Sequence, residues 1–308
     1  MDGEEVSADL IIDAMGRRSN LPNWLEAIGA RRPIEEAEDS GFIYYTRFFR
    51  SGTGVMPAYR AELLTYFHSF SFLRLPGDAG TWAVTVVISS GDQALKKLRN
   101  PKPWAALVAA CPLHAHWLDG EPITDVLSMA GTIDRYRRFV VDGVPVATGI
   151  ISVGDSWACT NPSLGRGITI GLMQALGTAE VVQQHLDNPF ELALSHDSMT
   201  ETRVTPWYRD TIQIDRKRMA GVNALIEGRP EPEQPADPRA RIANALNVAM
   251  MYDADLYRAA AEMRSVLALP QEVMARPGMV DRILEVVETH EAVNPSGPSR
   301  QELLRMLA

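Results

Sequence analysis

The sequence is poor in cysteine, has no long apolar run and carries fewer basic than acidic residues. Its 308 residues include Cys111 and Cys159 as the two cysteines, which excludes a disulfide framework and a Cys-x-x-Cys zinc site. The 30 basic and 39 acidic residues give a net charge of −9, which argues against binding to nucleic acid or to anionic membranes. No run approaches the roughly 18 apolar residues of an integral membrane segment, and the acidic start is unlike a secretory signal. We therefore expect a cytoplasmic protein, and the sequence is silent on its oligomeric state.

The composition is that of an ordinary globular chain. Hydrophobic residues make up 46% and charged residues 22%, which excludes collagen-like, coiled-coil and disordered chains. The length corresponds to about two domains as a prior. The chain is therefore long enough to bury a sizeable core.

Short aliphatic runs that end at a glycine are typical of buried parallel strands. Residues 8–16 read Ala-Asp-Leu-Ile-Ile-Asp-Ala-Met-Gly, and residues 147–155 read Ala-Thr-Gly-Ile-Ile-Ser-Val-Gly-Asp. Parallel strands need neighbours and crossover connections, yet no residues upstream of the first run supply them. Either a partner segment is missing, or later segments surround this strand.

The segment between these runs has β character. Residues 42–50 are rich in aromatics, and residues 70–75 and 82–88 flank Pro-Gly-Asp-Ala-Gly, which predicts an antiparallel hairpin. Residues 92–118 are predicted to be helical with breaks at the prolines, and residues 133–139 are predicted to form a strand.

The C-terminal half is predicted to be mostly helical. Helical spacing covers residues 168–185, 240–269 and 281–289, and a capping box of Ser299 with Glu302 predicts a final short helix. Residues 228–238 are rich in proline and charge, and they predict a surface loop.

The most informative segment is residues 153–168, Val-Gly-Asp-Ser-Trp-Ala-Cys-Thr-Asn-Pro-Ser-Leu-Gly-Arg-Gly-Ile. Asp155 is placed at the carboxyl end of a buried strand, where open α/β sheets bind ligands and where a carboxylate can accept hydrogen bonds from a polyol. Pro162 stiffens the loop, and Gly165 and Gly167 let a planar or anionic ligand approach the backbone. The next helix offers unpaired N–H groups. On spacing alone, a plain strand–loop–helix connection explains the glycines about equally well.

This segment resembles the second FAD fingerprint of flavoproteins with the p-hydroxybenzoate hydroxylase fold. The group contains single-component flavin monooxygenases, geranylgeranyl reductases and flavin-dependent halogenases, and the pattern is carried here by Gly154, Asp155, Pro162, Gly165 and Gly167. The resemblance implies that Asp155 binds the ribityl chain of FAD. It also implies that the helix start, near Ile168, faces the pyrimidine edge of the flavin.

A second segment, residues 13–19, is similar to the family's Asp-Ala-Thr/Asp-Gly-Arg-x-Ser strand end beside FAD. It reads Asp-Ala-Met-Gly-Arg-Arg-Ser, with Met15 in place of the more usual polar residue. The resemblance implies that Asp13, Gly16 and Arg17 lie beside the cofactor. Contact of Arg17 or Arg18 with an FAD phosphate and exposure of both side chains to solvent are equally weighted alternatives. One family feature is absent, because no Gly-x-Gly-x-x-Gly turn occurs to hold the ADP half of FAD. We therefore expect weak or absent FAD binding by these residues alone.

The implied fold is α+β in the p-hydroxybenzoate hydroxylase style. Residues 1–38 and 131–188 would form an incomplete, split FAD-binding domain that lacks its N-terminal dinucleotide-binding unit. Residues 39–130 would form a β-sheet substrate domain with a helix, and residues 189–308 a helical C-terminal region.

The implied function is that of an FAD-dependent oxidoreductase, with monooxygenation of a small apolar or aromatic organic substrate as the first candidate and NAD(P)H as the candidate electron donor. The alternatives are an isoprenoid-type flavin reductase and a non-catalytic remnant or interaction module that no longer binds FAD. No catalytic side chain stands out from the sequence.

Other conspicuous residues favour structural roles. Ser156 lacks the glycine pattern of a nucleophile elbow, which disfavours a hydrolase. His114-x-His116 has no third ligand in sight, which disfavours a metal site. Trp157 is expected to pack, with lining of the flavin or substrate pocket as the alternative.

Overall fold

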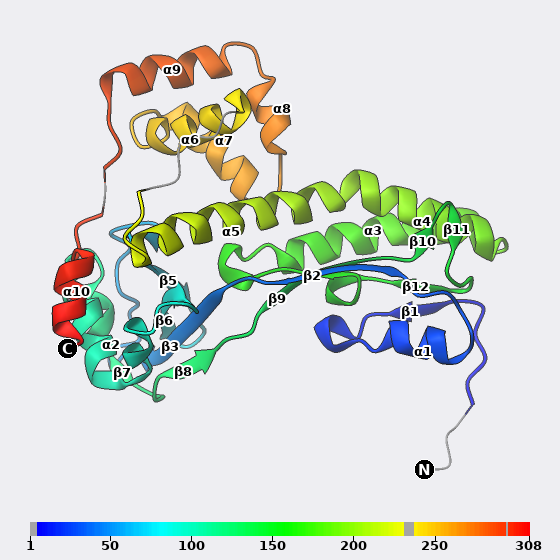
Figure 1. The fold of residues 1–308 in the computed structure, drawn as a ribbon, viewed down its shortest axis with the longest axis horizontal. Coiled ribbons are helices and arrows are strands. Elements are labelled where there is room, and N and C mark those ends of the chain that lie inside the picture. The colour runs from blue at the N-terminus through cyan, green and yellow to red at the C-terminus, as the bar shows by residue number, and fades with distance from the viewer. Residues whose placement is uncertain (1–4, 231–236, 294) are drawn as a thin grey trace. The chain divides into compact units, whose positions relative to one another are not determined.

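The computed structural model describes residues 5–230, 237–293 and 295–308, and it combines helices with several small sheets (Figure 1). The chain divides into two compact units. Unit 1 comprises Met1–Ser40, Ile133–Ile214 and Ala261–Ala275, and unit 2 comprises Gly41–Thr132, Asp215–Ala260 and Arg276–Ala308. The predicted C-terminal region, residues 189–308, is thus shared between the units. Within the described ranges, no helix has both the length and the apolar character that crossing a bilayer requires.

The two predicted aliphatic strands pair with each other in unit 1. Strand β1 (Ile11–Asp13) lies parallel to β12 (Ile150–Ser152), which confirms that both segments form parallel strands; that they pair with each other was not predicted. The prediction that β1 is buried was wrong, because Ile11 is 53% and Ile12 is 50% exposed. The reason is that this sheet has two strands, which leaves the other edge of β1 without a neighbour among the described residues.

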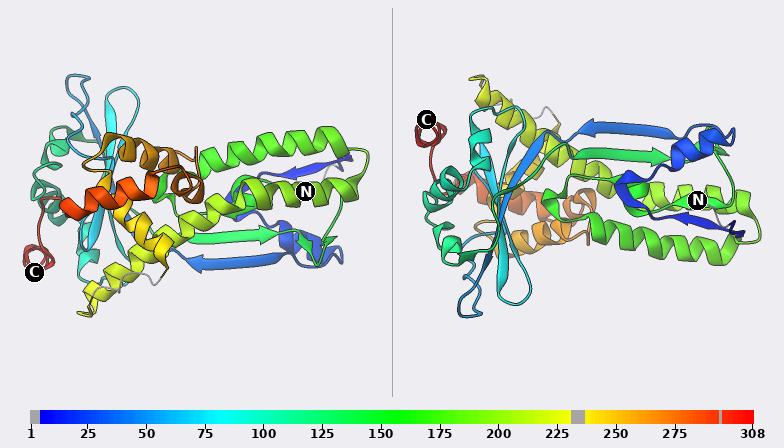
Figure 2. Two further views of the ribbon diagram at one scale, coloured as in Figure 1. Left: turned by 90° about the horizontal axis from the view of Figure 1, so that it is seen from above. Right: turned by 90° about the horizontal axis from the view of Figure 1, so that it is seen from below.

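A second sheet of unit 1 has the order β13–β9–β2. Strand β9 (Ile133–Arg138) confirms the predicted strand, and β13 (Ala158–Cys159) and β2 (Ile34–Asp39) flank it antiparallel. Figure 2 shows β2 and β9 as neighbouring arrows of opposite direction. The sequence did not reveal β2, because its Ile-Glu-Glu-Ala-Glu-Asp is largely polar and exposed and depends on pairing with β9.

The rest of unit 1 consists of helices and one short β-hairpin. Its elements are η1 (Gly16–Arg18), α1 (Leu21–Ala27), the hairpin of β10 (Val140–Val141) and β11 (Val144–Pro145), η4 (Gly154–Ser156), η5 (Pro162–Leu164), α3 (Gly167–His185), α4 (Pro189–Arg203), the first part of α5 (Thr205–Ile226) and α8 (Pro270–Met274). Helix α3 confirms the helix predicted after the glycine loop. Gly177 lets α3 approach α4 closely, since a Cβ there would overlap Met199 Sδ of α4.

Unit 2 is built around a six-stranded antiparallel sheet of order β4–β5–β6–β3–β7, with β8 also paired to β3. Its strands are β3 (Phe42–Arg50), β4 (Leu64–Tyr66), β5 (Phe70–Pro76), β6 (Thr81–Ser89), β7 (Glu121–Pro122) and β8 (Leu127–Met129). The predicted hairpin is confirmed, with Phe70 opposite Ile88. Tyr45 and Phe49 face the main core of the unit, whereas Tyr44 packs in a separate cluster on β3.

The helices of unit 2 are η2 (Leu95–Arg99), α2 (Pro101–Ala109), η3 (Ala115–Leu118), the second part of α5, α6 (Pro238–Ala249), the first part of α7 (Ala254–Arg264), α9 (Met279–Thr289) and α10 (Arg300–Met306). The capping box of Ser299 and Glu302 at α10 is confirmed. The helical prediction over residues 240–269 is confirmed in α6 and α7, but not as one continuous helix, because Asp253 begins α7 by accepting from the Asp255 and Leu256 N–H groups. The predicted loop over residues 228–238 lies partly outside the described residues.

Candidate functional site

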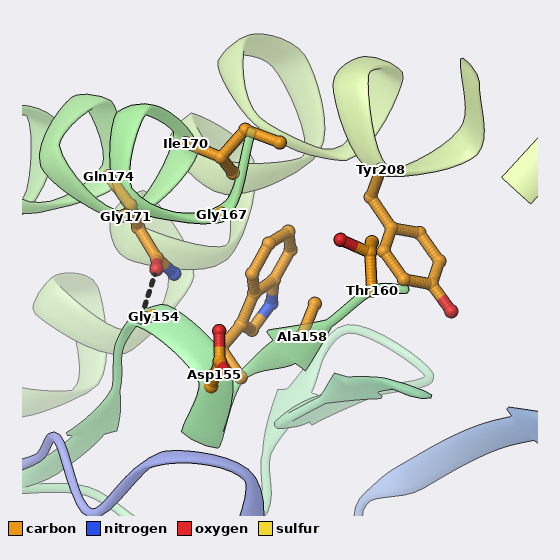
Figure 3. Close-up of a pocket in the computed structure, with 10 residues that line it drawn as sticks. Gly154, Asp155, Ala158, Thr160, Gly167, Ile170, Gly171, Gln174 and Tyr208 are labelled. Atoms are coloured by element: carbon orange, nitrogen blue, oxygen red, sulfur yellow. Dashed lines mark hydrogen bonds between the residues drawn. The ribbon is translucent and has the colours of Figure 1, made fainter. Parts of the chain in front are cut away.

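The glycine loop that follows β12 is fixed to helix α3 by a buried glutamine. Gly154 adopts a left-handed conformation with φ of +58°, and its N–H donates to Gln174 Oε1 at 2.6 Å (Figure 3). Gln174 is fully buried, and its Nε2 donates to the Ser152 carbonyl at 3.4 Å. The loop therefore has a defined position against the first turns of α3.

A small hollow that opens to solvent lies between this loop and α3. Its lining residues come from unit 1 and are Gly154, Asp155, Trp157, Ala158, Thr160, Gly167, Ile170, Gly171, Gln174 and Tyr208 (Figure 3). Of the sequence-predicted site residues, Gly154, Asp155 and Gly167 thus share one hollow. Pro162, Gly165 and Ile168 belong to the same loop and helix start but do not line it.

Asp155 has a carboxylate that a ligand can reach. Its side chain is 43% exposed, and Arg17 Nε lies 3.8 Å from Asp155 Oδ2 with a similarly exposed side chain. An ion pair of such exposure contributes little, because water screens it. The Asp155 carboxylate is therefore available to hydroxyl donors.

The start of α3 is open in front of the hollow. Gly165 has φ of +68°, and a Cβ built on Gly165 or Gly167 would meet no atom within 4 Å. The Arg166 side chain does not cap the helix, and its guanidinium turns inward to Asp210 Oδ2 at 2.6 Å and to the Met263 carbonyl at 3.0 Å. The first-turn N–H groups and the positive end of the helix dipole therefore remain accessible to a polar or anionic group.

Asp13 is turned into the protein. It is 6% exposed, and its carboxylate accepts from Ser19 Oγ at 2.5 Å, from the Met15 N–H at 3.0 Å and from Ser156 Oγ at 3.2 Å. The Gly16 N–H in turn donates to Ser156 Oγ at 2.7 Å. The two predicted motifs are therefore joined by hydrogen bonds among Asp13, Gly16 and Ser156. The fully buried Ser156 hydroxyl is engaged in these bonds.

Two arginines of β9 also join the motifs, and the sequence analysis missed both. Arg135 Nη2 donates to the Arg17 carbonyl at 2.8 Å and to the Asp155 carbonyl at 3.4 Å. Arg135 therefore spans from η1 to η4, directly at the predicted ribityl-binding residue.

Arg137 makes the second connection two residues further along the same face of the strand. Its Nη1 donates to the carbonyls of Ser19 and Ser156, both at 3.2 Å, and its Nε bonds Glu35 Oε2 at 2.7 Å. Arg137 is 5% exposed. The available signal was the alternation of arginines in the predicted strand, a pattern that places two charged groups on one face.

Aromatic residues close one side of the site. Trp157 packs edge-on against Tyr136 at 5.5 Å between ring centroids, and Tyr136 lies 5.6 Å from Tyr208. Burial raises the pKa of Tyr208, so its hydroxyl remains protonated at neutral pH. On the same strand as Tyr136, Asp134 accepts the Asn161 N–H at 2.5 Å, and burial raises the pKa of Asp134 to about 6.

Comparison with known proteins gives partial matches. No family model matches the chain. Protein Rv3254 of Mycobacterium tuberculosis (strain ATCC 25618 / H37Rv) is 30% identical over 175 residues, which is 56% of this chain and 36% of that protein. The chain therefore matches little more than a third of this curated relative.

Similar solved structures include a Diels-Alderase and a brominase that is named as flavin-dependent. The Diels-Alderase PyrE3 of pyrroindomycin biosynthesis aligns at 16% identity over 88% of this chain and 51% of its own, with a TM-score of 0.48. The flavin-dependent brominase Bmp2 aligns at 15% identity over 71% of this chain and 56% of its own, with a TM-score of 0.47.

Proposed function

We propose that this chain provides the ribityl- and ring-binding part of an FAD-dependent oxidoreductase. The observation that carries the proposal is the shared hollow, in which a half-exposed Asp155 and the uncapped start of α3 meet. The Asp155 carboxylate and the start of α3 match the two parts of FAD that the motif implies, the ribityl chain and the flavin ring. The Asp155 carboxylate would accept from ribityl hydroxyls, and the backbone freed of side chains at Gly165 and Gly167 would admit a flat ring.

FAD, when bound, supplies the redox chemistry, and the chain supplies position and electrostatics. The N–H groups at the start of α3 would stabilise negative charge on the pyrimidine side by about 0.3–2 kcal/mol. Arg135 and Arg137 would act as positioning residues, because they hold the backbone on both sides of Asp155. Arg17, 3.8 Å from Asp155, would help to orient that carboxylate or contact a phosphate.

The uncovered surface of unit 1 supports a site that is completed by other residues. Parallel sheets are normally covered on both faces, yet Ile11 and Ile12 of β1 are half-exposed. On α3, Leu172 is 61% and Leu176 is 71% exposed. A further strand–helix segment beside β1 would cover Ile11 and Ile12 and hold the ADP half of the cofactor. We therefore expect weak FAD binding by the chain alone.

For the complete protein we propose monooxygenation of a small apolar or aromatic substrate, with NAD(P)H as electron donor. The resemblance of the motif supports this reaction class. The alternative of an interaction module is favoured by the same apolar surface of β1 and α3. These functions differ in one measurement, since only the flavoprotein shows an absorbance change of bound flavin when NADH or NADPH is added.

The first test is a titration of the chain with riboflavin, FMN and FAD, followed by flavin fluorescence. If the ring and ribityl chain are the parts recognised, the three ligands bind with similar affinity. Replacing the charged acceptor in Asp155→Asn should weaken all three about 10- to 100-fold. Asp187→Asn, an exposed change outside the hollow, is the matched control.

The second test repeats the titration with a form extended by the coding sequence upstream of Met1. A stronger preference for FAD over riboflavin in the extended form would support the proposal. Absence of flavin binding by the extended form, or binding that Asp155→Asn leaves unchanged, would contradict it.

A further inference from the structure

Unit 2 contains a group of buried side-chain nitrogens without hydrogen-bond partners. They belong to Arg74, His114, His116 and Trp117, which we call the Arg74 cluster. The unpartnered atoms are Arg74 Nε and Nη1, both ring nitrogens of His114, His116 Nδ1 and Trp117 Nε1. Arg74 and Trp117 are fully buried, and His114 is 1% exposed. Buried polar groups are normally paired, so this concentration requires an explanation.

The cluster is compact and walled by aromatic rings. The Arg74 guanidinium carbon lies 5.6 Å from the centroid of the Trp117 ring. His114 is in the same turn as Trp117, whose backbone N–H donates to the His114 carbonyl at 3.0 Å. The His114 ring contacts Phe72 at 5.1 Å and Phe67 at 5.7 Å between centroids.

Arg74 lacks a counter-ion. Its Nη2 donates to two neutral acceptors, the Ala61 carbonyl and Thr65 Oγ1, both at 3.2 Å. Among the described residues, no carboxylate forms an ion pair with Arg74, although Glu62 attracts it from a greater distance. A buried charge without a partner is strongly unfavourable, so a negative group at this position would stabilise the fold.

The electrostatics of the cluster define the charge of its ligand. Burial lowers the pKa of Arg74 to about 10, so the guanidinium still carries its proton at neutral pH. Burial, followed by the charges of Arg74 and His116, lowers the pKa of His114 to about 4, so the His114 ring is neutral. The nearby positive charge disfavours a metal cation at His114 and His116. A ligand with a single negative charge would therefore neutralise the one uncompensated positive charge, that of Arg74.

We infer that the Arg74 cluster is a binding site for a small organic carboxylate. The carboxylate oxygens would accept from the free Arg74 and Trp117 N–H groups, and the rings of Phe67 and Phe72 would contact an apolar tail. A monoanion neutralises Arg74, whereas a dianion such as phosphate would leave a buried negative charge. The inference concerns unit 2 and does not depend on the flavin site of unit 1.

Access is expected through the segment between β3 and β4. Residues 51–63 form neither helix nor strand. This segment lies over the cluster, because His116 Nε2 bonds the Ala58 carbonyl at 2.7 Å and Tyr59 packs against Trp117 at 5.5 Å. Tyr59 itself is 55% exposed, so a local opening of this segment would admit a small anion.

The test compares acetate, benzoate, chloride and phosphate at constant ionic strength, with the thermal midpoint and tryptophan fluorescence as readouts. Acetate and benzoate at about 100 times their Kd should raise the midpoint by about 5 °C. Benzoate should bind more tightly than acetate, and phosphate should have no effect beyond ionic strength.

Variants assign the response to the cluster. Arg74→Met should abolish the shift and be at least as stable as the parent protein in carboxylate-free buffer. Trp117→Phe keeps an aromatic side chain and loses the indole N–H donor, and it should weaken binding about 10-fold. Arg47→Met removes an arginine of the same sheet whose Nε donates to the Thr124 carbonyl, and the carboxylate response should persist there.

Three results would overturn the inference. These are the absence of a carboxylate response in the parent protein, an equal response to chloride, and a response that Arg74→Met and Trp117→Phe leave unchanged. If Arg74→Met fails to fold, Arg74→Lys replaces it. That variant keeps the charge, loses the planar set of donors and should bind carboxylates more weakly than the parent protein.

Discussion

The two units differ in how far their own residues cover their sheets. In unit 2, strand β6 is buried along most of its length, with Val84, Val86 and Ile88 at 1% exposure or less. In unit 1, Ile11 of β1 is 53% and Leu176 of α3 is 71% exposed. Adjacent antiparallel strands can close a sheet through short hairpins, whereas a parallel pair requires crossover segments and further neighbours. Unit 2 thus buries its sheet with its own residues, some of them distant in the chain, whereas unit 1 leaves apolar side chains of β1 and α3 exposed.

The largest expected effect is a cavity in the core of unit 2. Phe72 is fully buried in a cluster of aromatic and aliphatic residues. Phe72→Ala should destabilise unit 2 by about 3–5 kcal/mol, because the surrounding side chains cannot fill the space of the ring. Hydrogen exchange of peptides from each unit, measured in denaturant, checks this. Equal loss of protection in unit 1 would show that the units unfold together and would remove the contrast.

A smaller effect is expected from breaking the connection between the motifs in unit 1. Arg137→Met removes the donor to the carbonyls of Ser19 and Ser156, and it should destabilise unit 1 by about 3 kcal/mol. The control is Arg203→Met, which removes an exposed pair with Glu180 and should cost about 0–1 kcal/mol. Chemical denaturation of both variants is the measurement. Similar losses for the two would contradict the role assigned to Arg137.

Acid should weaken unit 2 through His114. Its pKa is lowered to about 4 by burial, so the unfolded chain binds a proton below about pH 6.5 while the folded unit does not. Stability is therefore complete above pH 6.5 and falls by about 2–3 kcal/mol as the pH approaches 4. His114→Gln should flatten this dependence, and the exposed His68→Gln should not. Denaturant midpoints over this pH range in carboxylate-free buffer check the prediction, and a parallel pH profile for His114→Gln would refute it.

In unit 1, two buried titratable groups, His196 and Asp134, give the stability pH dependences of opposite sign. The pKa of buried His196 is lowered to about 4, so His196, like His114, makes the folded state less stable as the pH falls. The pKa of Asp134 is raised to about 6, so its contribution is present at low pH and is lost as the pH rises from about 4 to 6. Asp134→Asn should therefore make unit 1 more sensitive to acid. Hydrogen exchange of unit 1 peptides at pH 4 and pH 6 measures the change.

The smallest effect is expected on the open face of α3. Leu172 is 61% exposed, so Leu172→Ser should change the stability of unit 1 by about 0.5 kcal/mol or less. A larger loss, or a loss that depends on protein concentration, would show that a second chain covers this face in solution. Thermal unfolding at two concentrations distinguishes these cases.

The sequence predicted the parts of the site that depend on neighbours in the chain. The loop from Gly154 to Gly167 and the helix after it follow from glycine, proline and helical spacing over a short stretch. It could not predict that Asp13 turns inward, because the partner Ser156 lies 143 residues away along the chain. The prediction of a buried β1 failed for a similar reason, since burial depends on the number of neighbouring strands.

The sequence by itself thus determined the β5–β6 hairpin, helix α3 and the motif that places Asp155 at the end of a strand. These features arise from backbone preferences and side-chain periodicity within about 20 residues. Only the tertiary structure decided that Arg135 and Arg137 join the two motifs and that Arg74 is buried without a counter-ion. Hydrogen bonding and desolvation of a charged side chain depend on groups that folding brings together from distant parts of the chain.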